Sequence, residues 1–202
     1  EATLPQVYKY ASCTDAEIRR WLTKIRTKKV DGRRVLNNEQ YEVVKLVAHR
    51  VCDEMRAVNT GDYSDLNEPL RWCVHGGPGT GKSHVIKILK GELFGKILKW
   101  NMGVEFQIVV FQAVMADLLG GDTVHHALNI GVFGKAFQSR EGSNDKKSLD
   151  VMKAVLQLRW LIIDEISMVS ARLLADIDCK LRSYYNTVDK FALDSKGHVR
   201  PF

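Results

Sequence analysis

Several features are missing from this sequence, and their absence narrows the classes of protein it can belong to. The 202-residue chain has no run of about 18 apolar residues, the length that a membrane-spanning helix needs. It has no signal peptide with a charged start and an apolar centre. Its four cysteines are far apart and form no Cys-x-x-Cys pair, which argues against a disulfide framework or a zinc site. We therefore expect an intracellular protein with no membrane partner, whose cysteines are reduced and mostly buried.

The composition is that of a globular protein with a modest excess of positive charge. Hydrophobic residues make up 45% and charged residues 27% of the chain, which argues against disorder. The net charge of +6 is compatible with a polyanionic partner without requiring one. The cations near the N-terminus, among them Arg20, Lys24 and Lys29, are most simply the solvated face of an amphipathic helix. Because the chain begins at Glu1 and ends in a polar stretch, we expect a fragment.

Hydrophobic periodicity divides the chain into a helical N-terminal part and a region where strands and helices alternate. Helices are predicted at 14–29, opened by a capping box of Thr14 and Glu17, and at 38–57, with a break at Asp31-Gly32 between them. Short apolar strands that alternate with helices indicate a parallel sheet with helices on both faces, so the fold class is α/β. The strands are expected at 70–74, 106–111 and 160–163, and the later helices at 81–98, 114–119, 149–158 and 170–185. The inner face of the helix at 81–98 is predicted to include Val85, Leu89, Leu93 and Ile97. That of the helix at 170–185 is predicted to include Leu174, Ile177 and Leu181.

The most informative motif is a glycine-rich turn between a predicted strand and a predicted helix. It reads Gly76-Gly77-Pro78-Gly79-Thr80-Gly81-Lys82-Ser83 and matches the phosphate-loop pattern G-x-x-x-x-G-K-[ST]. Glycines let backbone N–H groups approach a phosphate, and the start of the helix adds a partial positive charge there. We expect all eight residues to bind a nucleotide, with Lys82 on its β- and γ-phosphates and Ser83 ligating Mg²⁺.

A second motif supplies the carboxylates that a phosphate loop requires. The apolar run Leu161-Ile162-Ile163 delivers Asp164 and Glu165 at the carboxyl end of a strand, the edge where open α/β sheets bind ligands. Asp164 is predicted to hold Mg²⁺ through its water shell, and Glu165 to be the general base for the attacking water. Adjacent Asp and Glu favour an ATPase, and no Asn-Lys-x-Asp guanine-reading sequence occurs.

These motifs occur in an order that resembles a known family. They read L-N-N-E-Q at 36–40, the phosphate loop at 76–83, G-D-T-V-H at 121–125 and L-I-I-D-E-I-S-M-V at 161–169. Over about residues 36–186 the chain resembles the Pif-type ATP-dependent DNA helicases of superfamily one, relatives of RecD, and the Helitron transposon versions look nearest. The resemblance implies a RecA-like P-loop NTPase domain at 36–202, incomplete at its C-terminus, after a helical segment at 1–35. It implies ATP and Mg²⁺ as cofactors.

The same resemblance implies roles for single residues. Gln40 would read the adenine edge, although Asn37 and Gln40 also fit a capping box. Gln112, Thr123 and His125 match positions that contact DNA in the family.

One of these motifs departs from the family pattern. An Ala-Pro-Thr-Gly-like turn is replaced here by Val110-Phe111-Gln112-Ala113, in which we expect Phe111 to belong to the core. As an alternative to contacting DNA, His125 and His126 could cap the helix that follows them.

The function that the resemblance implies is that of the first motor domain of a DNA helicase. Such a domain couples ATP hydrolysis to 5′-to-3′ translocation and unwinding, on single strands and duplex junctions, in DNA repair, recombination and telomere maintenance in the nucleus or mitochondrion. Since a second motor domain with its arginine finger is expected outside the chain, the isolated fragment should be weakly active or inactive. Two alternatives stay open: another P-loop ATPase, such as a ring-forming remodeller or clamp loader, and a degenerate transposon remnant that binds nucleotide or nucleic acid without turnover.

Overall fold

The computed structural model describes residues 12–60, 62, 66, 70–128, 130 and 158–184. The chain divides into two units, Glu1–Trp100 and Asn101–Phe202. The domain boundary predicted near residue 35 stays a prediction.

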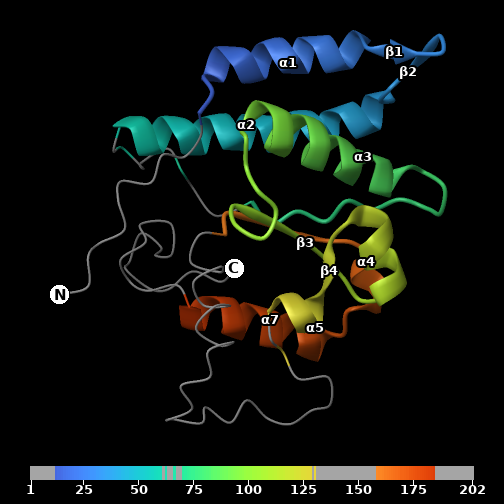
Figure 1. Ribbon diagram of the computed structural model, residues 1–202, viewed down its shortest axis with the longest axis vertical. Helices are drawn as coiled ribbons and strands as arrows, with labels where there is room; N and C mark the ends of the chain where they lie inside the picture. The colour runs from blue at the N-terminus through green and yellow to red at the C-terminus, as the bar shows by residue number, and fades with distance from the viewer. Residues whose placement is uncertain are drawn as a thin grey trace. The chain divides into compact units, whose positions relative to one another are not determined.

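Amphipathic helices build the first unit. α1 (Asp15–Thr27) and α2 (Asn38–Thr60) confirm the first two predicted helices. α1 lies beside α2, which also packs against α3 (Lys82–Ile88) (Figure 1). The buried side chains recur at helical spacing, as the sequence predicted. They include Ile18, Trp21, Leu22 and Ile25 on α1, and Val44, Val47, Val51 and Met55 on α2.

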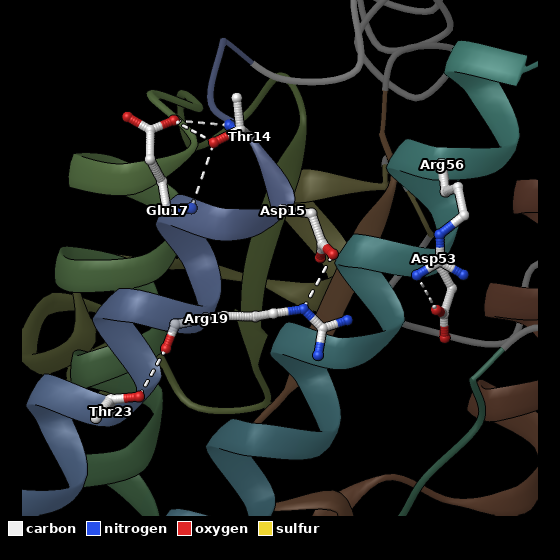
Figure 2. Close-up of polar contacts among 7 residues, drawn as sticks. All are labelled: Thr14, Asp15, Glu17, Arg19, Thr23, Asp53 and Arg56. Atoms are coloured by element: carbon white, nitrogen blue, oxygen red, sulfur yellow. Dashed lines mark hydrogen bonds and ion pairs between the residues drawn. The ribbon is translucent and has the colours of Figure 1, made fainter.

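The capping box predicted at the start of α1 is present (Figure 2). The Thr14 hydroxyl oxygen accepts the Glu17 N–H at 3.3 Å, and the Glu17 carboxylate accepts the Thr14 N–H at 2.7 Å. The hydrogen bond from the Thr14 backbone is the main reason that the pKa of Glu17 is lowered. An ion pair between Asp15 and Arg19, at 3.0 Å, follows in the first turns of the helix. The helix therefore starts at a fixed residue.

A short antiparallel hairpin connects α1 to α2. It consists of β1 (Lys29–Val30) and β2 (Arg33–Arg34). Between the strands, Asp31 and Gly32 have φ angles of 51° and 76°, as a type I′ turn requires, and Asp-Gly is a preferred sequence for that turn. The predicted helix at 14–29 is thus too long, because α1 ends at Thr27 and the next residues turn into the hairpin.

The helix that follows the phosphate loop changes type along its length. The sequence predicted one helix at 81–98, but α3 continues as a π-helix, η1 (Leu89–Ile97). The wider π turn rotates the buried face, so Phe94 is fully buried whereas Ile97 is only half-buried. The other predicted inner residues are buried: Val85, Leu89 and Leu93.

The strand predicted at 70–74 is wrong: these residues have no strand conformation. Two of the apolar side chains in this segment are largely exposed, Trp72 at 49% and Val74 at 40%. A strand depends on a backbone partner as well as on an apolar run, and the run alone does not establish one.

A three-stranded parallel sheet forms the centre of the second unit, in the order β4-β3-β5. β3 (Phe106–Val110) and β5 (Trp160–Ile163) confirm two predicted strands. β4 (Asp122–Thr123) was not predicted, because two polar residues carry no strand signal. The parallel sheet agrees with the predicted α/β class.

Helices pack on this sheet and complete the core of the second unit. α4 (Ala113–Leu119) follows β3, α5 (Val124–Ala127) follows β4, and β5 leads through the short 3-10 helix η2 (Ile166–Met168) to α7 (Ala171–Tyr184) (Figure 1). One cluster of buried side chains joins β3, α5 and α7, and it contains Val109, Val124, Leu128, Leu158, Ile177 and Leu181.

For the second unit, one prediction is wrong and another concerns residues that the structure does not describe. Leu174, predicted to be buried, is 45% exposed, whereas Leu173 packs against the core. The helix predicted at 149–158 lies outside the described residues, apart from its last residue, Leu158. Among the helices described, none has the length and apolar character needed to cross a bilayer.

The four cysteines are free, but they are not mostly buried as predicted. Cys52 is buried, Cys13 is half-buried, and Cys73 and Cys179 are exposed. Burial, with a contribution from Asp15, raises the pKa of the Cys52 thiol to about 12. Cys52 therefore stays a neutral thiol at physiological pH.

We predict that Thr14→Ala lowers the free energy of unfolding by about 1 kcal/mol, because the first turn of α1 loses its cap. Urea unfolding measures this loss, and Thr14→Ser, which keeps the hydroxyl, is the matched control. Since the pKa of Glu17 is lowered in the folded state, the carboxylate's share of the cap should disappear as pH falls through that pKa. Equal stability of the Ala and Ser variants would contradict the role of the cap.

Candidate functional site

The glycine-rich loop of the first unit ends at the N-terminus of α3. Gly81 is the N-cap of that helix with φ 83°, and Gly79 has φ 76°. Both values lie in the left-handed region, which glycine adopts without strain. Ser83 follows in the first turn of α3 and is half-buried. The backbone thus takes the sharp turn that the motif predicted.

The Lys82 side chain folds back over this loop. Its amine donates hydrogen bonds to the carbonyls of Gly76, at 2.7 Å, and Gly77, at 3.1 Å. The Thr80 hydroxyl donates to the same Gly77 carbonyl at 2.8 Å. These contacts hold the cation of the motif on the glycine-rich segment, where it can meet a phosphate.

Gln40 connects the start of α2 to the phosphate loop. Gln40 and Asn37 form the predicted capping box: the Asn37 N–H donates to Gln40 Oε1 at 3.0 Å, and the Gln40 N–H to Asn37 Oδ1 at 2.8 Å. In addition, Gln40 Nε2 donates to the Thr80 carbonyl at 2.9 Å. An amide group has two N–H donors and two lone pairs on its oxygen, so these two side-chain contacts use only half of its capacity. Adenine reading by Gln40 stays a prediction that this hydrogen-bond count allows.

A second link joins the same two segments, and no sequence motif indicates it. His84 Nε2 lies 2.8 Å from the carbonyl oxygen of Val35, just before the start of α2. Because a carbonyl only accepts, the tautomer that makes this bond carries its proton on Nε2. The two links hold the region around Gln40 against the first turn of α3.

The two carboxylates of the second motif follow β5 and differ in burial. The Asp164 N–H extends the pairing with β3 by donating to the Val109 carbonyl at 3.0 Å, and Asp164 is only 5% exposed. Its Oδ1 accepts the Glu165 N–H at 3.1 Å. Glu165 has φ 55°, an uncommon value for a residue other than glycine, and is exposed. The chain therefore turns at Glu165, and the separate roles of the two carboxylates stay a prediction.

A hollow of about 210 Å³ lies beside Glu165 in the second unit. Its lining comes from the end of β3, from α4 and from η2, and consists of Val110, Phe111, Gln112, Met115, Glu165 and Met168. Gln112, for which the resemblance implies a DNA contact, and Glu165, the predicted general base, thus line the same hollow. Sequence reasoning missed both methionines, because a methionine carries no signal beyond its apolar character.

Phe111 is not the core residue that we expected. It is 36% exposed, and its ring meets that of His125 edge-on, with centroids 5.9 Å apart. The ring lies at the position where β3 has ended and α4 has not begun, so the sheet does not cover it.

Thr123 and His125 lie at the start of α5. The Thr123 hydroxyl caps this helix by accepting the His126 N–H at 3.3 Å. His126 pairs with Asp122, and both histidines lie within α5, whose cap is Thr123; capping of a later helix falls outside the described residues.

A comparison with models of protein families shows to which family the chain belongs. A model of the PIF1-like helicases matches residues 35–196. The chain belongs to the PIF1-like helicase family. No curated protein and no solved structure gives a significant match. A PIF1-like helicase is a nucleic-acid motor that binds ATP, and the parallel sheet of the second unit is consistent with the P-loop fold that this family implies.

We predict that Gly81→Ala lowers the free energy of unfolding by about 1–3 kcal/mol, because an alanine here would be strained at φ 83°. Its Cβ would also lie 2.5 Å from Gln40 Nε2 and break the contact with Thr80. The matched control is Gly77→Ala, where nothing lies within 4 Å of a Cβ and φ is not left-handed. Urea unfolding of both variants tests this, and equal losses would contradict it.

Proposed function

We propose that this PIF1-like helicase chain is the first motor domain of an ATP-dependent DNA helicase, with a RecA-like fold. In this proposal it hydrolyses ATP to move along single-stranded DNA in the 5′-to-3′ direction and to open duplex junctions. Repair, recombination and telomere maintenance, in the nucleus or mitochondrion, are the processes we propose for it. The observation that carries the proposal is the phosphate loop held by Gln40 in a chain of this family.

The residues of the loop fit a magnesium-bound nucleotide. Gly77 and Gly79 leave open space beside the backbone, and the Lys82 amine supplies the positive charge next to it. The Ser83 hydroxyl and the Asp164 carboxylate are hard oxygen donors of the kind that Mg²⁺ prefers, Asp164 acting through water. The ion would neutralise phosphate charge. Gln40 would read the adenine edge with the amide N–H and the lone pair that its contacts to Asn37 and Thr80 leave over.

In this proposal hydrolysis depends on the two carboxylates having separate tasks. The exposed Glu165 takes the proton of the water that attacks the γ-phosphorus. Lys82 stabilises the negative charge that develops as the bond to the ADP oxygen breaks. The difference in burial supports this division, because Glu165 is exposed whereas Asp164 is only 5% exposed.

The nucleic-acid side of the proposal rests on the second unit. Gln112 lies in the hollow beside Glu165, so a strand bound by its amide would lie close to the proposed base. Thr123 already caps α5 and His125 meets Phe111, so their contacts with DNA would come in addition to these roles.

The altered turn favours one second candidate, a nucleotide-binding remnant without turnover. Where the family has a Pro-Thr-Gly sequence, this chain has an exposed Phe111 followed by Gln112 and Ala113. ATP binding without hydrolysis by the wild-type protein, in the presence of DNA, would favour this candidate.

We predict that Lys82→Ala weakens ATP affinity by about 1.5–3 kcal/mol, roughly tenfold to a hundredfold, because a charge-assisted hydrogen bond to phosphate is lost. Titration with a fluorescent ATP analogue measures the change. Lys87→Ala removes an exposed cation from the same helix and is the matched control. Unchanged affinity in the Lys82 variant would refute the proposed phosphate site.

For Glu165→Gln we expect ATP affinity to stay within about twofold, because the side chain keeps its size, while turnover falls by roughly 10²–10⁴-fold with the loss of the base. DNA-stimulated phosphate release measures turnover. Normal turnover in this variant would mean that another group activates the water.

A further inference from the structure

The hairpin between α1 and α2 presents a dense positive charge to solvent. Residues 28–34 contain four cations and one carboxylate, and all seven are exposed. The antiparallel register places Lys29 directly opposite Arg34, and Val30 opposite Arg33. Since residues opposite each other share a face of a hairpin, Lys29 and Arg34 lie on one face, and Arg33 on the other.

Like charges directly opposite each other destabilise a pair of strands, so this arrangement is unfavourable by itself. Neighbouring cations have partners: Lys28 lies 3.7 Å from Glu92, and the Arg26 guanidinium lies over the Tyr41 ring. Within the described part of the chain, no carboxylate forms an ion pair with Lys29, Arg33 or Arg34. An anion shared by two of these side chains would offset their repulsion.

The base of the hairpin is tied to the helix that follows the phosphate loop. The Val35 N–H donates to the Lys28 carbonyl at 3.0 Å, which closes the hairpin. The Val35 carbonyl is the group that meets His84 Nε2 on α3. The hairpin is therefore held on the nucleotide-binding unit at a fixed position and is not an independent tail.

We propose that the β1–β2 hairpin binds the sugar–phosphate backbone of a nucleic acid through Lys29, Arg33 and Arg34. Guanidinium groups match the geometry of a phosphate with paired N–H donors. The proposal rests on the membership of the chain in a family of nucleic-acid motors, and is independent of the roles proposed for Lys82 and Glu165. A nucleic acid fits better than a lipid surface, because Val30 is the hairpin's only apolar side chain.

The test is the double variant Lys29→Gln/Arg34→Gln of the full 202-residue chain. Fluorescence anisotropy with a labelled oligo(dT) strand and a labelled duplex gives the affinity as a function of salt. The steepness with which log affinity falls against log salt concentration is the salt slope. Two lost phosphate contacts should lower it by roughly 1.4 for a single strand or 1.8 for a duplex. At moderate salt, the double variant should lose about tenfold in affinity for the DNA that the hairpin binds. Whichever of the two probes, single strand or duplex, shows this loss is the form that the hairpin recognises.

Two control variants separate a specific contact from the effect of net charge. Arg20→Gln/Lys24→Gln removes the same charge from the exposed face of α1 and should change affinity by less than about twofold. Lys29→Arg/Arg34→Lys keeps the charge at both positions and should retain the slope. Equal losses in the hairpin and α1 variants would overturn the proposal.

The remaining arms distinguish other ways in which the proposal could fail. Binding of the fluorescent ATP analogue should be unchanged in the hairpin variant, and its loss there would mean that the hairpin acts through the fold. A wild-type chain that binds neither DNA form overturns the proposal, as does one that binds only phosphatidylserine–phosphatidylcholine vesicles. A chain that binds DNA through the hairpin but binds no ATP would overturn the proposed ATPase function alone.

Discussion

The hydrogen bond between the Gln40 amide and the Thr80 carbonyl joins two segments of the first unit that lie 40 residues apart, and it holds the start of α2 beside the phosphate loop. The amide reaches the loop only because Gly81 has no side chain, since a Cβ there would lie 2.5 Å from Gln40 Nε2. The bond between His84 and Val35 connects the same two segments a second time. Through these contacts, the start of α2, the hairpin and the phosphate loop form one connected structure.

The second unit concentrates its polar groups where the parallel strands end. β3 leads into the turn at Phe111 and Gln112, and β5 leads into Asp164 and Glu165. Because parallel strands share one carboxyl edge, these residues meet although more than fifty positions separate them in the sequence. The sheet brings the groups together, and the left-handed turn at Glu165 then separates the buried carboxylate from the exposed one.

The parts of the fold that could be predicted from the sequence depend on local patterns. α1 and α2 follow from helical spacing and capping, and β3 and β5 follow from apolar runs that pair with each other. The segment at 70–74 has a similar run but no strand partner, and nothing within the run itself reveals that difference. The π-helix η1 was also unpredictable, because π-helices are rare and the apolar residues of this segment fit the α-helical period.

For the candidate site, the identity of the residues could be predicted but their contacts could not. The motif identifies Lys82, Asp164 and Glu165 by type and spacing. It does not reveal that Gln40 holds the loop, that His84 reaches Val35, or that Phe111 is exposed, because each depends on contacts distant in sequence.

The uneven exposure of the cysteines equips the native chain for fluorescent labelling. Cys73 is an exposed thiol three residues before the phosphate loop, and Cys179 is an exposed thiol on α7. Cys52 resists alkylation because its thiol is buried and its pKa is about 12. A maleimide dye under mild conditions would thus attach preferentially to one site in each unit. Both units could therefore be labelled through their own cysteines, with no engineered residue.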